Sequence, residues 1–204
     1  MPKTLRSDGF LDYSGWWWQL ARPWVILPTH GALILLTGGS AWRRSLSATM
    51  FCFAFCSGYA SWTLFEYVLH RWFLHHHRIK AIQAVFWTRL HREHHQYRSM
   101  RDPDHHGVHV GVSLPLALLV ILAASTEDSG VALALVAGWL FGYLAYEALH
   151  WLFHSAERDC WIGRLVPIRA LWDAHRIHHL VTMKANYGFV ALFWDRRFRT
   201  YRAR

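Results

Sequence analysis

Four long runs of apolar residues divide the chain, and each approaches the roughly 20 residues that a helix needs to cross a bilayer. Polar and charged segments separate them, so the hydrophobic positions recur in blocks of membrane-spanning length. The third run is the shortest and contains Pro115, which predicts a kinked or tilted helix. The runs cover Trp24–Trp42, Ala48–Leu69, Val108–Ser125 and Val131–Leu149. The pattern predicts an all-α integral membrane protein with about four transmembrane helices.

The residues before the first run predict an N-terminal segment that lies in the membrane interface. Residues 1–22 are polar and aromatic and include Trp16-Trp17-Trp18, and tryptophan concentrates where a bilayer meets water. A signal peptide is the alternative interpretation of the first apolar run, but the charged lead of 22 residues is long for the basic region that opens such a peptide. No Gly-, Ser- or Pro-rich linker interrupts the chain. We therefore expect a single membrane-embedded domain over 1–204, with its catalytic region at 60–204.

Composition supports a membrane protein and argues against a nucleic-acid-binding one. The chain is 53% hydrophobic and holds 13 tryptophans, more aromatic surface than a soluble domain of this size usually buries. Its net charge is +9, but the basic residues flank the apolar runs, as expected for membrane orientation and contact with anionic headgroups. Three cysteines do not make a disulfide framework.

The basic residues also predict an orientation. Five of the 22 Lys and Arg residues precede Arg71, which leaves 17 in Arg71 and the later segments outside the apolar runs. The break between the third and fourth runs has none. The positive-inside bias therefore predicts that residues 71–107 and 150–204 are cytoplasmic, although Arg43-Arg44 would then fall on the other face.

Four clusters of histidine are the most informative feature of the sequence. The chain has 16 histidines, and one cluster begins where the second run ends and another where the fourth run ends. Because the third and fourth runs form a hairpin, we expect all four clusters on the same membrane face. The clusters are His70 with His75, His91 with His94 and His95, His150 with His154, and His175 with His178 and His179.

Helical spacing lets most of these side chains converge. Residues at i, i+3 and i+4 share a helix face, and three of the four clusters have such spacing. His70 and His75 are five apart, which separates them by about 140° on a regular helix. Either the helix breaks or bulges after His70, or the two residues serve different metals.

Ten imidazoles are too many for one metal ion and a natural number for two. Imidazole suits zinc, copper, iron and nickel. Ligating histidines also need a group that accepts the far ring proton. We expect carboxylates near the clusters to do this: Glu66, Glu147, Asp173 and, as a weaker candidate, Asp102. The sequence leaves open the roles of His76, His77, His105, His106 and His109.

At these clusters the chain resembles the fatty acid hydroxylase/sterol desaturase superfamily, whose histidine boxes occur in the same order. The boxes here read HRWFLH at 70–75, HREHH at 91–95, HWLFH at 150–154 and HRIHH at 175–179. The segments Asn186–Phe189 and Trp194–Phe198 resemble the closing motifs of that family. Arg199 stands where the family usually has glycine.

The resemblance implies a metal centre and its partners. It implies two iron ions, which zinc can replace in isolated protein, with molecular oxygen as co-substrate and the ten box histidines as ligands. Some relatives carry a fused cytochrome b5-like domain, and none fits within this chain. We therefore expect a separate electron-transfer protein, either cytochrome b5-like or a ferredoxin with its reductase.

The predicted function is hydroxylation of an unactivated C–H bond in a lipid. A site at the membrane edge admits an acyl chain from the bilayer, so a fatty acyl substrate is favoured. A carotenoid ring hydroxylase and a sterol hydroxylase or desaturase are alternatives, and the resemblance leaves open hydroxylation against desaturation. Outside enzymes, a membrane metal transporter is the alternative, but transporter ligands are expected in the middle of a span.

Overall fold

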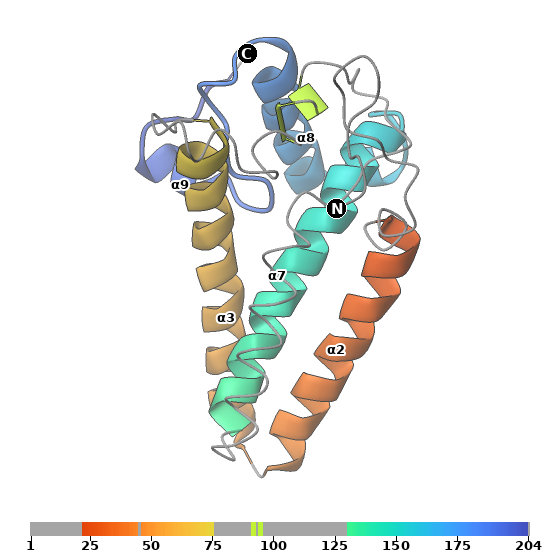
Figure 1. The fold of residues 1–204 in the computed structure, drawn as a ribbon, viewed down its shortest axis with the longest axis vertical. Coiled ribbons are helices and arrows are strands. Elements are labelled where there is room, and N and C mark those ends of the chain that lie inside the picture. The colour runs from red at the N-terminus through yellow and green to blue at the C-terminus, as the bar shows by residue number, and fades with distance from the viewer. Residues whose placement is uncertain (1–21, 45, 76–90, 93, 96–129, 204) are drawn as a thin grey trace, which may run out of the picture.

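A computed structural model describes residues 22–44, 46–75, 91–92, 94–95 and 130–203. These residues form helices and connecting turns without a β-strand among them, which agrees with the predicted all-α class. Three long helices lie side by side, and short helices cover one end of them (Figure 1).

The first two long helices form a hairpin. Helix α2 spans Pro23–Arg43 and helix α3 spans Ala48–Val68, so only a short turn separates them. Pro23 occupies the first turn of α2, where the missing N–H costs nothing. Ser47 caps α3 by accepting a hydrogen bond from the backbone N–H of Met50 (3.2 Å).

The third long helix, α7 (Gly130–Ser155), packs against both members of this hairpin. Glycines allow the close approach of α3 and α7. A Cβ at Gly58 would overlap the carbonyl oxygen of Leu135, and a Cβ at Gly138 would overlap that of Phe55. The two backbones are therefore in direct contact, as in tightly packed transmembrane helices.

Within the described residues, three helices are long and apolar enough to cross a membrane: Pro23–Arg43, Ala48–His75 and Gly130–Ser155. They match the first, second and fourth predicted runs. The third run, Val108–Ser125, lies outside the described residues, as does the proposed interfacial segment except for Arg22. Large apolar side chains point outward from the bundle, including Leu35 (77% exposed) and Phe53 (70% exposed), as expected for a lipid-facing surface.

The ends of α3 and α7 that carry histidines lie together, beneath the C-terminal part of the chain (Figure 1). Helix α3 continues into a π-helix, η1 (Leu69–His75). After α7 come a 3₁₀ turn, η2 (Ile162–Arg164), then α8 (Val166–Leu180) and α9 (Phe193–Arg197). A core of aromatic side chains, including Trp62, Tyr146, Phe153, Trp172 and Phe189, links the bundle to this helical cap.

Candidate metal centre

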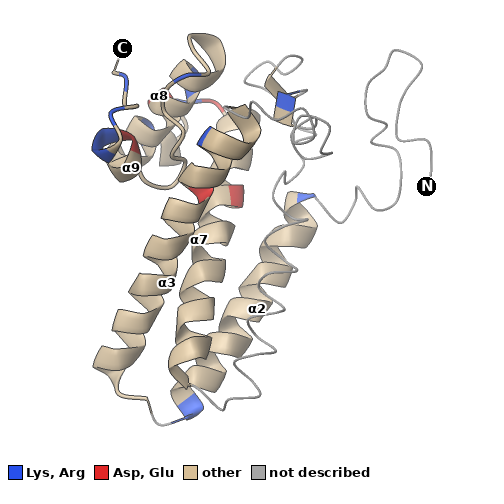
Figure 2. Cartoon of the chain, turned by 60° about the vertical axis from the view of Figure 1, so that its left-hand side comes forward, with Lys and Arg blue, Asp and Glu red and all other residues tan. Residues whose placement is uncertain are grey.

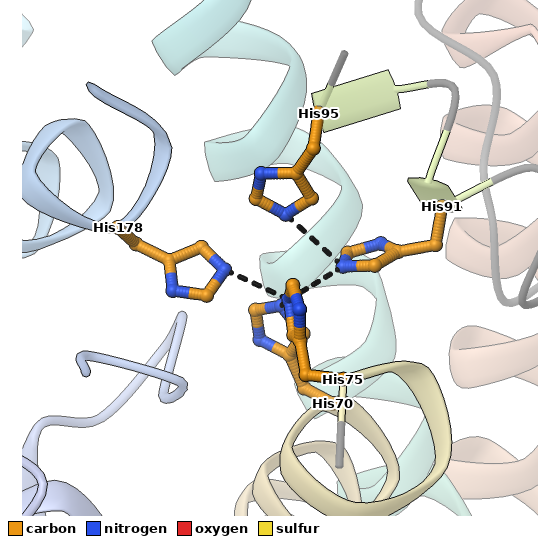
Figure 3. A group of neighbouring side chains, drawn as sticks. All are labelled: His70, His75, His91, His95 and His178. Atoms are coloured by element: carbon orange, nitrogen blue, oxygen red, sulfur yellow. Dashed lines mark hydrogen bonds between the residues drawn. The ribbon is translucent and has the colours of Figure 1, made fainter. Parts of the chain in front are cut away.

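Five histidines from three parts of the chain converge on one point (Figure 3). Each offers one ring nitrogen, and these nitrogens all lie within 4.8 Å of one another. We call this set group 1, and its members are His70 and His75 from η1, His91 and His95, and His178 from α8.

Four further histidines form group 2, with nitrogens that also lie within 4.8 Å of one another. Its members are His94, His150 and His154 from α7, and His179 from α8. His175 joins this side, because its Nε2 lies 2.8 Å from Nε2 of His154. The structure thus brings together all ten histidines of the predicted boxes.

The two HxxHH boxes divide between the groups in a complementary way. His91 and His95 contribute to group 1 and His94 to group 2, while His178 contributes to group 1 and His179 to group 2. The rings of the two groups are in direct contact, since those of His95 and His179 stack with centroids 4.1 Å apart. Two adjacent sites therefore share both boxes.

The π-helix explains how the remaining pair meets. A π-helix has more residues per turn than an α-helix, so residues five apart return to the same face. Nε2 of His75 lies 3.1 Å from Nε2 of His70, and both rings belong to group 1. The predicted bulge is confirmed, and the two residues do not divide between different groups.

Backbone carbonyls orient two of the rings. Nδ1 of His70 donates a hydrogen bond to the carbonyl of Tyr187, and Nδ1 of His178 donates to the carbonyl of Ala185, each at 2.7 Å. A carbonyl oxygen only accepts, so both Nδ1 atoms carry the proton. The lone pair of each neutral ring is therefore on Nε2, facing the centre of group 1.

This donor set fits a cation. Nε2 of His75 lies 3.1 Å from His70, 3.0 Å from His178 and 2.9 Å from His91, measured to the Nε2 atom of each. A hydrogen on His75 Nε2 satisfies one of these contacts at most, and the other lone pairs face one another. A divalent metal ion among the nitrogens converts this repulsion into coordination.

Burial keeps the histidines of the cap in the form that binds metal. It lowers the pKa of His91, His95, His175 and His179, and the neighbouring histidines lower it further. These rings are accordingly neutral at pH 7. Neutral imidazole is the ligand form, whereas imidazolium has no lone pair to offer.

A short loop, Ala185–Val190, supplies both orienting carbonyls and is itself tightly held. Asp195 accepts hydrogen bonds from the backbone N–H groups of Tyr187 (2.8 Å) and Gly188 (2.7 Å). Glu66 accepts from the N–H of Phe189. A buried carboxyl group on each side therefore fixes the loop that orients His70 and His178.

Asn186 fixes the start of this loop. It has a positive φ of 57°, which asparagine tolerates better than most residues. Its amide donates to the carbonyls of Ala174 (3.2 Å) and Arg202 (3.0 Å), and its Oδ1 accepts from the N–H of Arg202 (2.8 Å). These bonds tie the loop to both α8 and the end of the chain.

Two of the carboxylates predicted to accept ring protons accept hydrogen bonds from other groups. Glu66 acts on the loop, one step removed from His70, and Asp173 accepts two hydrogen bonds from Arg158 (2.7 and 2.6 Å). Glu147 is buried on α7, three residues before His150. Asp102 lies outside the described residues, as do His76, His77, His105, His106 and His109.

Sequence reasoning missed the roles of Ala185, Tyr187 and Asp195. Every residue has a backbone carbonyl, so the sequence does not reveal that those of Ala185 and Tyr187 accept hydrogen bonds from histidine rings. The signal present was indirect, since Asn186-Tyr187-Gly188 and Trp194-Asp195 belong to the motifs noted above.

Aromatic side chains close the membrane side of the centre. Phe189 packs on the rings of His150 (centroids 4.4 Å apart) and His175 (4.3 Å), and the Tyr146 hydroxyl lies 3.2 Å from Nδ1 of His150. Glu66, His70, His91, Tyr146 and Phe189 line a narrow gap beside group 1, which has no room for a water molecule. The centre is thus screened from water and faces the apolar bundle.

Comparison with known proteins gives a consistent family. The family model for fatty acid hydroxylases matches residues 55–200. The ceramide very long chain fatty acid hydroxylase SCS7 of Saccharomyces cerevisiae is 30% identical over 196 residues, which cover 91% of this chain and 45% of that protein. The dihydroceramide fatty acyl 2-hydroxylase FAH2 of Arabidopsis thaliana is 27% identical, covering 98% and 79%.

A solved structure supports the same family. The hydroxylase domain of full-length Scs7p superposes with a TM-score of 0.69 at 26% identity, covering 94% of this chain and 71% of that one. The chain spans about half the length of the two yeast relatives it matches. The matched region contains all four histidine boxes. The chain belongs to the fatty acid hydroxylase family.

Proposed function

We propose that this protein is a membrane-bound dimetal oxygenase that hydroxylates an unactivated C–H bond of a lipid acyl chain. It uses O2 and electrons from an external donor. The observation that carries the proposal is the pair of adjoining histidine groups at one end of an apolar helical bundle. All ten box histidines are the ligands, with group 1 and group 2 each holding one ion.

The metals are two iron ions, with zinc as a substitute in isolated protein. Neutral imidazoles suit both ions, so the donor set does not choose between them. When bound, an iron pair supplies the activation of O2 that an unactivated C–H bond requires. The protein supplies the geometry and the dry surroundings.

Each part of the chain has a task in this scheme. The carbonyls of Tyr187 and Ala185 hold the rings of His70 and His178 in the tautomer that ligates through Nε2. The hydroxyl of Tyr146 lies 3.2 Å from Nδ1 of His150, where it can accept that ring's proton and leave Nε2 to ligate. Phe189 excludes water and offers an apolar surface on which the acyl carbon can rest.

The membrane arrangement follows the sequence. We propose one domain over 1–204 with four spans, an interfacial segment at 1–22 and a cytoplasmic cap that holds the histidines. The charge bias toward residues 71–107 and 150–204 supports the cytoplasmic face. At the membrane edge, an acyl chain can enter from the lipid while its headgroup stays at the basic interface.

The acyl substrate is favoured by the names of the relatives, which are hydroxylases of ceramide, dihydroceramide or fatty acids. None of those names points to the carotenoid or sterol alternatives. Metal transport is less consistent with the site, because its histidines lie at the ends of spans and in the cap.

Lipid profiling under ¹⁸O2 tests the proposal. Cells that express the wild type with a competent donor are compared with cells that express His94→Ala. We expect an ¹⁸O-labelled hydroxyl on acyl chains in the wild type and its loss in the variant. His30→Gln is the matched control, because His30 is buried in α2 and belongs to neither group. Metal-loaded wild type that forms no labelled lipid would overturn the proposal.

A further inference from the structure

The surface around α9 is strongly basic. Four arginines of residues 193–203 are exposed, namely Arg196, Arg197, Arg199 and Arg202. The one acidic residue of this segment, Asp195, is fully buried and accepts hydrogen bonds from the loop. Figure 2 shows basic residues on α9 and along the chain that follows it. The face presents positive charge with no acidic residue of its own segment to offset it.

Exposed aromatic rings adjoin these arginines. Trp72 of η1 is 43% exposed and Phe198 is 39% exposed, with ring centroids 6.2 Å apart. The guanidinium of Arg71 lies over the Trp72 ring at 4.8 Å. An aromatic centre with an arginine rim is the composition of a protein-binding surface, where tryptophan and arginine carry much of the binding energy.

A line of rings leads inward from this surface. The Trp72 ring lies 6.0 Å from that of Tyr67, and Tyr67 lies 6.1 Å from Tyr187. Tyr187 is 5.5 Å from the ring of His178, centroid to centroid, and its carbonyl accepts the hydrogen bond from His70. Both tyrosines are fully buried. An exposed ring is therefore connected to group 1 by aromatic contacts, which a membrane-contacting face would not need.

We propose that this face binds an acidic one-electron carrier protein and that electrons reach the metal centre through Tyr67 and Tyr187. The docking face consists of Trp72, Phe198, Arg196, Arg199 and Arg202. The proposal rests on the proposed function. Each carrier gives up one electron and is oxidised. Two electrons, two protons and O2 convert one C–H bond to C–OH and release one water, so two carriers serve each turnover.

The binding test uses the reduced, soluble haem domain of a cytochrome b5 as the acidic carrier. Its affinity is measured for the full chain in nanodiscs of phosphatidylcholine, with metal and after chelation. The variant Arg196→Glu/Arg199→Glu/Arg202→Glu should bind at least about tenfold more weakly, and salt should weaken the wild type in the same way. Arg43→Glu/Arg164→Glu is the control for charge reversal elsewhere on the chain, since both arginines are exposed and lie outside the face.

The transfer test follows haem oxidation at saturating carrier. Trp72→Leu should bind the carrier more weakly, and at saturating carrier it should still lose the fast phase of oxidation, whereas Trp72→Phe keeps a ring and should retain most of that phase. Equal effects of Leu and Phe would contradict the ring path. Wild-type carrier binding in the triple variant would overturn the docking face.

A third measurement asks whether the face binds anionic lipid instead of a carrier protein. Anionic lipid is the competing ligand of this face, and mass spectrometry of phosphatidylserine retained by the protein detects it. Loss of retained phosphatidylserine in the triple variant, with carrier kinetics unchanged, would overturn the proposal. Because carrier affinity is read without lipid product, a failure of the face is distinguishable from a failure of the hydroxylase function.

Discussion

Nε2 of His70 and Nε2 of His75 lie 3.1 Å apart, although the residues are five positions apart in the chain. The π-helix that contains them closes this spacing. Extra residues per helical turn are rare and concentrate at functional sites, because they re-aim side chains at a cost in regular hydrogen bonding. Here the result is that His75 occupies the middle of group 1, within 3.1 Å of three other rings.

The two groups should lose metal separately. His75→Ala removes the central ligand of group 1, and His154→Ala removes a ligand of group 2. We expect each to lower the metal content of purified protein from about two ions per chain to about one, since a few imidazoles define each site. Elemental analysis measures this, with His30→Gln as the control. Metal content equal to wild type in either variant contradicts the assignment.

Asp195 should matter to metal binding without touching metal. Asp195→Ala leaves the N–H groups of Tyr187 and Gly188 without their acceptor, at about 1–3 kcal/mol for each. The loop then loosens its hold on His70 and His178, which should weaken metal binding about 10–100-fold. Competition with a chelator gives the affinity. Asp159→Ala, at an exposed aspartate of the cap, should behave as wild type.

Gly188 should not tolerate a side chain. A Cβ there would overlap the carbonyl oxygen of Ala191 and lie 2.8 Å from Oδ2 of Asp195. Gly188→Ala should therefore cost about 1–3 kcal/mol of unfolding free energy through overpacking. Thermal unfolding in detergent measures it. Gly39→Ala is the control, because nothing lies within 4 Å of a Cβ at that helical position. Equal midpoints for the two variants would show that the loop is less tightly packed than described.

Arg199 should be replaceable by glycine with a gain in stability. Its φ is 57°, in the left-handed region, which costs a residue with a Cβ about 1–2 kcal/mol. Glycine relieves that cost but loses more chain entropy on folding, so Arg199→Gly should gain up to about 1 kcal/mol. Arg197→Gly, within α9, should lose about 1 kcal/mol instead. A lower unfolding midpoint for Arg199→Gly than for wild type would contradict this account.

Acid should destabilise the metal-free protein. Burial lowers the pKa of His91, His175, His178 and His179. Below about pH 6.5 the unfolded chain takes up protons that the folded cluster does not, so unfolding is favoured as the pH falls further. Above that pH, stability should not depend on these groups. Unfolding midpoints of chelated protein between pH 8 and pH 5 test this, and a midpoint that rises on acidification would contradict it.

Much of the fold was predictable because a long run of apolar residues predicts a membrane-spanning helix. The apolar runs that begin at Trp24, Ala48 and Val131 correspond to α2, α3 and α7. Their ends agree to within one residue, except that α7 continues beyond the run to Ser155. In a bilayer, backbone groups must pair within the helix, so a long apolar run has few alternatives to a helix. Contact between α3 and α7 was less visible, because Gly58 and Gly138 reveal their role only once the neighbouring helix is in place.

The metal centre was likewise predictable in part from the sequence. Spacing of i, i+3 and i+4 predicted that the HxxHH boxes converge, and the structure places their rings in two adjoining groups. Spacing alone could not decide how the members of one box divide between two groups, because that depends on how helices cross. Nor could it predict that Tyr187 and Ala185 orient His70 and His178, since every residue type has a carbonyl.

The most direct test of the central claim is an anomalous difference map at the iron absorption edge, from crystals of the iron-loaded protein. We predict two peaks in each chain. One lies among Nε2 of His70, His75, His91, His95 and His178, and the other among the rings of His94, His150, His154 and His179, beside His175. A single peak, or none within coordination distance of either histidine group, would contradict the account.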